Sequence, residues 1–188
     1  MTFTPGGRLL VVSSVEEGVT RVFDPDTGEQ VGEPIGDSTA PAVIASNGPG
    51  GTLVTSDFSG TIRLVDLSSR KAVGPPMVGR PEAVTSHSVL PGGRELVAGF
   101  LGGEAQLFDI ASGRRIGDPF PTSPWSLAVS PDGKTFITGD GAGMMRWDID
   151  SDRWRATACA VAGRNLTAAE WAQYLPHGER YRATCPGN

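Results

Sequence analysis

One pattern recurs four times along the chain, at intervals of roughly 40 to 44 residues. Each copy begins with a glycine turn and continues into a short apolar run that is rich in β-branched residues. The turns are Pro5-Gly6-Gly7, Pro49-Gly50-Gly51, Pro91-Gly92-Gly93 and Pro131-Asp132-Gly133, followed by the runs 9–12, 52–55, 95–98 and 135–138. Runs of this length between turn signals are typical of buried strands. The repeat therefore predicts a series of similar small β-units, and the 26 glycines and 15 prolines suit such a turn-rich chain.

A second anchor repeats in phase with the first. In every copy the next strand ends on an apolar or aromatic residue followed by aspartate. These pairs are Phe23-Asp24, Val65-Asp66, Phe108-Asp109 and Trp147-Asp148. A polar turn follows each pair, as a hairpin requires, and in the fourth copy we expect this hairpin turn at residues 149–152.

Proline placement indicates the order of the strands. A proline-containing segment follows the polar turn in the first three copies, at residues 30–35, 72–77 and 115–120. Proline cannot donate a hydrogen bond to a central ladder but is tolerated on an edge strand. We therefore expect this segment to be the outermost strand of each sheet.

The four copies resemble WD (tryptophan-aspartate) repeats, and the fourth, Ser130–Lys134 through Trp147-Asp148, is the closest match. The other three copies carry Phe or Val in place of the Trp. The resemblance implies an all-β fold, a β-propeller arc of four four-stranded blades. The approximate blades are residues 1–36, 37–78, 79–120 and 121–158. The family's usual role implies a rigid scaffold for protein–protein interaction, without catalysis of its own.

The C-terminal tail, residues 159–188, departs from the repeat. Thr167 and Glu170 have the spacing of a capping box, which predicts a short helix over residues 168–175. We expect the tail to cap the last blade, with Trp171 and Tyr174 packed against it. The alternative is that the tail is a docking peptide for a partner.

The tail also resembles the C-terminal end of large bacterial WD-repeat proteins, many of which carry an NTPase or a protein kinase upstream. This resemblance implies the C-terminal part of such a protein. The alternative function is then the sensor fragment of a larger signal-transduction NTPase or kinase. Four blades are few for the family, so we expect either a piece of a longer chain or self-association of two copies that complete a propeller.

Charge and hydropathy exclude several classes of partner. A net charge of -5 argues against a nucleic-acid-binding surface, which needs clustered Lys and Arg. No run approaches the roughly 20 apolar residues that span a bilayer, and the chain does not begin with a signal peptide pattern. We therefore expect a cytoplasmic protein without a membrane partner. Cys159 and Cys185 are then expected as free thiols, although they would pair in an oxidising compartment.

Neither catalysis nor a cofactor is indicated. His87 and His177 lie near no nucleophile motif. The glycine-rich segment 139–143 is a hairpin turn, because no helix pattern follows it to bind phosphate. The acidic residues Asp24, Asp26 and Glu29 lie at a repeat turn, where aspartate is favoured for its short side chain, so no metal site is expected.

Two groups of residues are singled out by position. The structural residues of the repeat are Asp24, Asp66, Asp109, Trp147 and Asp148. The candidate partner-binding residues lie where each outer strand leads into the next blade, and they are Asp37, Arg80, Glu82 and Trp125. Trp125 is the best anchor candidate, because tryptophan often contributes a large share of binding energy at interfaces.

Overall fold

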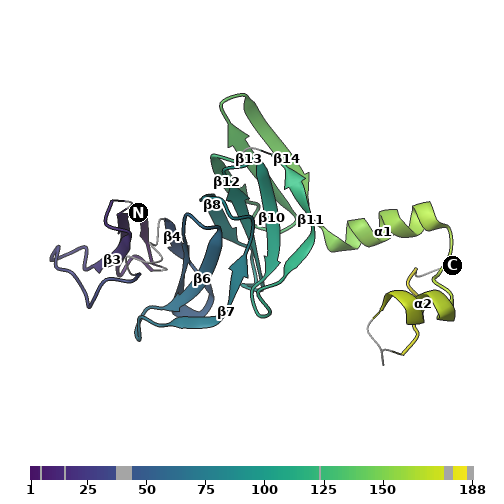
Figure 1. Ribbon diagram of the computed structural model, residues 1–188, viewed down its shortest axis with the longest axis horizontal. Coiled ribbons are helices and arrows are strands. Elements are labelled where there is room, and N and C mark those ends of the chain that lie inside the picture. The colour runs from purple at the N-terminus through teal and green to yellow at the C-terminus, as the bar shows by residue number, and fades with distance from the viewer. Residues whose placement is uncertain (5, 15, 37–43, 123, 176–179, 186–188) are drawn as a thin grey trace. The chain divides into compact units, whose positions relative to one another are not determined.

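The computed structural model of the chain describes residues 1–4, 6–14, 16–36, 44–122, 124–175 and 180–185. Most of the described chain is β-structure, in four small antiparallel sheets, and two short helices follow them (Figure 1). The chain divides into two compact units, Met1–Trp147 and Asp148–Asn188.

The four sheets, numbered 1 to 4 here, follow the four repeats in chain order. Sheet 1 contains β1 (Thr2–Phe3), β2 (Leu10–Ser14) and β3 (Val19–Phe23). Sheet 2 contains β4 (Ile44–Asn47), β5 (Thr52–Ser56), β6 (Thr61–Asp66) and β7 (Ala72–Val78), with a 3-10 turn at Pro49–Gly51. Sheet 3 contains β8 (Val84–Val89), β9 (Glu95–Phe100), β10 (Glu104–Asp109) and β11 (Arg115–Pro121). Sheet 4 contains β12 (Ser126–Val129), β13 (Thr135–Asp140) and β14 (Gly143–Asp148).

The expectation of four strands in every sheet is wrong for sheets 1 and 4, which have three strands each among the described residues. In the first repeat the proline segment forms only two isolated bridges, Thr20 to Ile35 and Phe23 to Gln30. Between them Gly32 adopts a left-handed φ of 69°, and Pro34 has no N–H to donate. In sheets 2 and 3 the proline segment does form the outermost strand, as β7 and β11.

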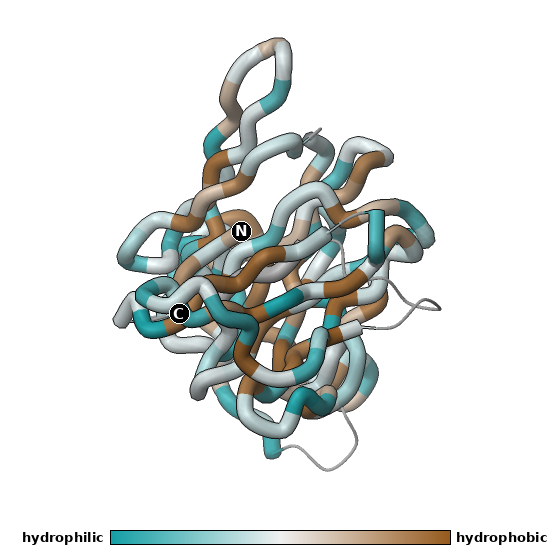
Figure 2. The backbone as a smooth tube through the Cα atoms, turned by 90° about the vertical axis from the view of Figure 1, so that its left-hand side faces the viewer, coloured by the Kyte–Doolittle hydropathy of each residue, from teal (hydrophilic) through white to brown (hydrophobic). Residues whose placement is uncertain are grey.

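Each pair of consecutive sheets buries apolar side chains between them. An apolar residue of the proline segment packs against the next sheet in all three cases. Ile35 packs in a cluster with Leu53 and Val65 of sheet 2. Met77 packs in a cluster with Leu96 and Phe108 of sheet 3. The Phe120 ring lies edge-on to the rings of Phe136 and Trp147 of sheet 4, with centroid distances of 5.0 and 5.4 Å. In Figure 2 the hydrophobic stretches run through the strands, whereas many of the loops are hydrophilic. The hydrophobic core is therefore a series of sheet-on-sheet layers.

The first strands of successive sheets lie side by side. β4 contacts both β1 and β8, and β8 contacts β12. Sheets that meet at their first strands and follow one another in chain order are compatible with an all-β, propeller-like fold.

The second unit begins differently from the hairpin that the repeat predicts. Residues 149–152 do not make a hairpin turn; they start helix α1 (Ser151–Ala162), which lies where the fourth blade was expected to continue to residue 158. The reason is the carboxylate of Asp150, which accepts hydrogen bonds from the backbone N–H groups of Asp152 and Arg153 and so caps the helix. Helix α2 (Ala168–Tyr174) has the expected capping box between Thr167 and Glu170.

The expectation of free thiols is wrong, because Cys159 and Cys185 form a disulfide. The pairing joins α1 to the tail segment, which the side chain of Asn165 also holds by accepting from the Cys185 N–H at 2.7 Å. A disulfide is typical of an oxidising compartment, so the cytoplasmic location stays a prediction.

Trp171 and Tyr174 lie in different environments within this unit. Trp171 is buried, with its ring edge-on to Tyr181 at 5.6 Å and the Arg182 guanidinium 5.9 Å from its centroid. Tyr174 is exposed. Of the helices described, none combines the length and the apolar character needed to cross a bilayer.

Candidate protein-interaction surface

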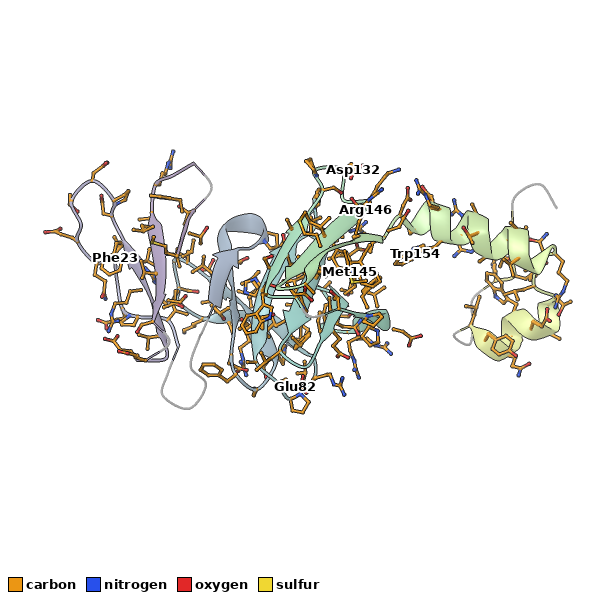
Figure 3. The ribbon with its side chains drawn as sticks, turned by 90° about the horizontal axis from the view of Figure 1, so that it is seen from above. Phe23, Glu82, Asp132, Met145, Arg146 and Trp154 are labelled. Carbon is orange, nitrogen blue, oxygen red and sulfur yellow. A yellow bond between two sulfur atoms is a disulfide. The ribbon has the colours of Figure 1, made fainter. Side chains whose placement is uncertain are left out.

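Antiparallel order brings two kinds of turn to one edge of the sheets. The turn between the second and third strands and the segment that leads into the next sheet both lie at this edge, because the strands reverse direction each time. The segments are 57–60, 79–83, 100–103 and 122–125, of which residue 123 is not described. We call them together the loop edge. Figure 3 labels Glu82 on this edge and Asp132, from the turn between β12 and β13, on the opposite one.

Backbone hydrogen bonds join these segments into a continuous series. The Gly79 N–H donates to the Gly60 carbonyl at 3.1 Å, and the Leu101 N–H donates to the Ala83 carbonyl at 3.0 Å. The Thr122 N–H then donates to the Gly103 carbonyl at 3.1 Å. The loop edge is thus held in place by main-chain contacts from sheet 2 to sheet 4.

One close approach explains a glycine of this series. A Cβ at Gly60 would lie 1.7 Å from the Arg80 carbonyl oxygen, and the residue has a left-handed φ of 82°. Only glycine fits there without moving the segment that follows β7.

Three large apolar side chains are exposed along the loop edge, one at each of three consecutive sheets. Phe58 follows β5 and is 50% exposed, Leu101 follows β9 and is 57% exposed, and Trp125 precedes β12 and is 68% exposed. Exposed apolar side chains gathered in one region are typical of binding surfaces. Trp125 is also anchored, since its backbone N–H donates to the Gly139 carbonyl at 3.1 Å.

The charged residues of the loop edge are mostly engaged within the chain. Arg80 forms an ion pair with Glu104, with 3.1 Å between the nitrogen and the carboxylate oxygen. The Glu82 carboxylate lies close to Gly102, and one of its oxygens is buried without a hydrogen-bond partner among the described residues. Of the predicted partner-binding residues, the structure therefore brings Arg80, Glu82 and Trp125 to the same edge, and Asp37 lies outside the described residues.

Asp57 holds the turn 57–60 of the loop edge in place. The sequence alone did not single out this residue. Its side chain is buried, and one carboxylate oxygen accepts hydrogen bonds from the N–H and hydroxyl of Ser59 and from the N–H of Thr61. The other oxygen accepts from Arg63 at 3.1 Å. Burial alone would raise the pKa of Asp57, but these hydrogen bonds together lower it below its ordinary value. The residue fixes the turn that presents Phe58.

The repeat aspartates lie at the opposite edge and hold the turns there. Asp66 accepts from the hydroxyl and N–H of Ser68 and the N–H of Ser69, which lowers its pKa to about 2. Asp109 accepts in the same way from Ser112, and its pKa is lowered by the Ser112 hydroxyl and N–H. The corresponding side chain of Asp24 accepts from the N–H groups of Asp26 and Thr27. These contacts are local and structural.

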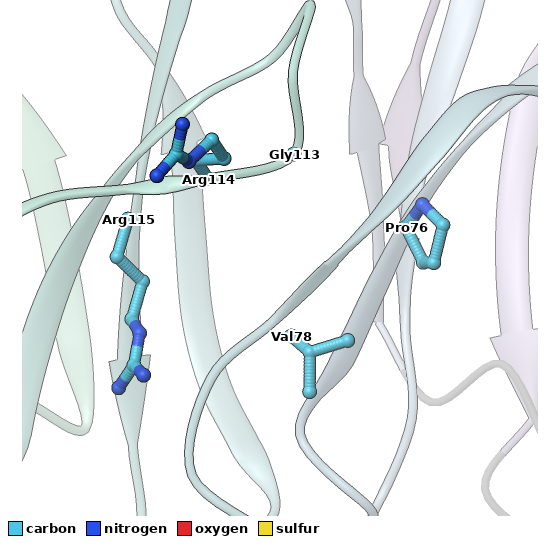
Figure 4. Close-up of a pocket in the computed structure, with 5 residues that line it drawn as sticks. All are labelled: Pro76, Val78, Gly113, Arg114 and Arg115. Carbon is cyan, nitrogen blue, oxygen red and sulfur yellow. The ribbon is translucent and has the colours of Figure 1, made fainter. Parts of the chain in front are cut away.

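One further hollow in the described part of the first unit measures about 410 Å³ and is lined by Pro76, Val78, Gly113, Arg114 and Arg115 (Figure 4). The two guanidinium groups do not converge on one point there. Among the described residues no group of three or more His, Cys, Asp or Glu side chains is placed to bind a metal ion.

Sequence reasoning found Trp125 but not Phe58 or Leu101. The signal was present, because both are apolar residues two positions before the turn glycines Gly60 and Gly103, where a polar residue is usual. Because each residue lies within two positions of the end of a strand, the sequence does not distinguish it from an apolar residue of that strand.

Comparison with known proteins gives a partial match. No family model matches the chain. WD repeat-containing protein 3 of Homo sapiens is 36% identical over 64 residues, which is 32% of this chain and 7% of that protein. The chain thus spans only a small part of the length of the curated relative it matches. The match and the sheet-rich structure support a WD-like repeat.

Proposed function

We propose that this chain is a WD-type, propeller-like platform that binds another protein at its loop edge and has no catalysis of its own. The observation that carries the proposal is the placement of Phe58, Leu101 and Trp125 at one edge of three consecutive sheets. The name of the matched protein, which refers to its repeats, agrees with such a role.

The arrangement suits a protein partner better than a small molecule. Interface energy is concentrated in a few aromatic and apolar anchors on rigid supports, with polar groups around them. The loop edge offers such anchors on turns tied by main-chain hydrogen bonds, with the Arg80–Glu104 pair beside them. The expected partner presents an apolar patch of its own, because the three anchors are apolar and Arg80 is already paired with Glu104 within the chain.

The proposal is tested by changing the three anchors together. The variant Phe58→Ser, Leu101→Ser, Trp125→Ser should lose the proteins that crosslink to the wild-type chain, as identified by mass spectrometry. Once a partner is purified, Trp125→Ala alone should weaken its binding about 30-fold or more, which calorimetry measures directly.

The matched control is the double variant Val73→Ser, Val78→Ser, which removes two comparably exposed apolar side chains from the outer strand β7. It should keep the same partners. If the control and the loop-edge variant lose the same proteins, or if neither loses any, the loop edge is not the binding surface.

A role as the sensor fragment of a larger NTPase or kinase remains the alternative hypothesis.

A further inference from the structure

Sheet 4 ends the series of layers with an exposed face. On β13, Phe136 and Thr138 point toward sheet 3 and are buried, whereas Ile137 points the other way and is 41% exposed. Met144 of β14 is 81% exposed. Two shallow hollows of about 150 and 100 Å³ flank Ile137 on this side, the first lined also by Ala128 and the second by Ser126 and Met144.

The exposed face repeats the residues of a face that is covered inside the chain. The register aligns Ser86 with Gly99 and Ser88 with Val97 in sheet 3, and Ser126 with Gly139 and Ala128 with Ile137 in sheet 4. Sheet 3 therefore presents Ser, Ser, Val and Gly where sheet 4 presents Ser, Ala, Ile and Gly.

In sheet 3 this face is covered by the next sheet. Val97 is fully buried, and a Cβ at Gly99 would lie 2.3 Å from a ring carbon of Pro124, just before β12. Val11 of sheet 1 and Val54 of sheet 2 occupy the equivalent position and are also fully buried against the sheet that follows. Ile137 alone of these four residues has no sheet over it.

The complementary face is exposed at the other end of the series. In sheets 2 to 4, the residue just before Val54, Val97 or Ile137 packs against the preceding sheet. These residues are Leu53, Leu96 and Phe136, and all three are fully buried. In sheet 1 the equivalent residue, Leu10, is only half-buried. It shares the outer side of sheet 1 with its register partners Phe3 and Phe23, and Phe3 is exposed.

We infer that the exposed face of sheet 4 packs against the exposed face of sheet 1 in a second copy of this chain. Both halves of the sheet-on-sheet interface are present on one molecule, and the same interface occurs three times within it. The contact is head-to-tail, so two copies form a closed pair through two equivalent interfaces.

Two features make this interface weaker than the internal ones. Among the described residues, sheet 4 is not followed by a segment like those that supply Ile35, Met77 and Phe120 to the internal layers. Arg146 takes the place of Leu107 on the exposed face, where its guanidinium can remain in solvent while its stem covers apolar surface (Figure 3). Pairing should therefore depend on protein concentration.

The experiment is sedimentation velocity of the full chain over a wide range of concentration. The mass should rise from 19.6 kDa toward twice that value. The variants Ile137→Glu and Met144→Glu should each raise the dissociation constant about 30-fold or more, with unchanged circular dichroism. Because Met144 is more exposed than Ile137, its replacement is expected to disturb the fold less. The matched control is Val73→Glu, at an exposed apolar residue of the outer strand β7 of sheet 2, which should dimerise as the wild type does.

Mixing distinguishes a head-to-tail contact from a symmetric one. Phe3→Glu and Ile137→Glu should each be monomeric alone, but an equal mixture should form a pair through the one interface that remains intact. A wild-type chain that stays monomeric throughout overturns the proposal. So does a dimer that Phe3→Glu leaves unaffected, because that result means that sheet 4 pairs with itself or with another surface.

Discussion

At the scale of single residues, buried polar side chains decide where the exposed ones lie. Asp57 is the strongest example, since its carboxylate accepts four hydrogen bonds from Ser59, Thr61 and Arg63 in the turn that presents Phe58. Its removal leaves two backbone N–H groups and a guanidinium without this acceptor. A hydroxyl or amide that loses its partner in a buried position costs more free energy than the hydrogen bond contributed.

We predict that Asp57→Ala lowers the free energy of unfolding by about 1 to 3 kcal/mol in urea denaturation. Asp57→Asn should cost less, because the amide oxygen still accepts from the Ser59 and Thr61 N–H groups. The control is Asp118→Ala, at an exposed position of β11, which should change stability by less than about 0.5 kcal/mol. Equal losses at the two positions would contradict this account of Asp57.

At the scale of elements, the disulfide connects α1 to the end of the second unit. Its loop encloses α2 and the Arg164–Glu170 ion pair, whose shortest distance is 2.7 Å. A unit of this size has little apolar core, so a crosslink contributes a large share of its stability.

We therefore predict that Cys159→Ser lowers the stability of residues 148–188 by about 2 to 4 kcal/mol, mainly by enlarging the unfolded ensemble. Hydrogen exchange followed by mass spectrometry should show faster exchange in α2 and unchanged exchange in β8 to β11. Ala158→Ser is the matched control, because it places the same hydroxyl one residue away in the same helix. If α2 exchanges equally slowly in Cys159→Ser and in the control, the disulfide does not stabilise this unit.

Much of the β-structure could be predicted from the repeat, because the period and the turns agree in all four copies and the edge prolines recur in the first three. The elements that differ are those where a local interaction replaced the repeat. Asp150 caps a helix where analogy predicted a hairpin, and the first proline segment forms bridges instead of a strand. The disulfide was not predictable, because two distant cysteines pair only if the fold brings them together. The same holds for the loop edge: Trp125 stood out as a tryptophan in a connection, whereas Phe58 and Leu101 became candidates only when antiparallel order placed their turns beside it.

At the scale of the whole molecule, one interface is used repeatedly, and its two unmatched halves remain at the ends of the series. The layers explain why sheets this small are stable, since each sheet buries apolar residues on both sides except at the two ends. The turns between them are held by carboxylates that accept hydrogen bonds. Their charge state therefore links the stability of both units to pH.

The last prediction concerns that dependence on pH. Hydrogen bonds lower the pKa of Asp66 to about 2, the Arg164 and Thr167 side chains with the Thr167 N–H lower that of Glu170 to about 2, and the pKa values of Asp57, Asp109 and Asp132 are also lowered. A carboxyl group with a lower pKa in the folded state than in the unfolded state stabilises the fold above the unfolded value of about 4. This stabilisation is lost as the pH falls through the folded value. The melting temperature should therefore be level near neutral pH and fall between about pH 4 and about pH 2.

Asp66→Asn keeps an oxygen acceptor but does not titrate, so its melting temperature should fall less steeply over that range, whereas Asp118→Asn should follow the wild type. If the melting temperatures of all three chains fall with the same slope, the acid transition comes from other groups. The titration of Asp66 then does not contribute to the loss of stability.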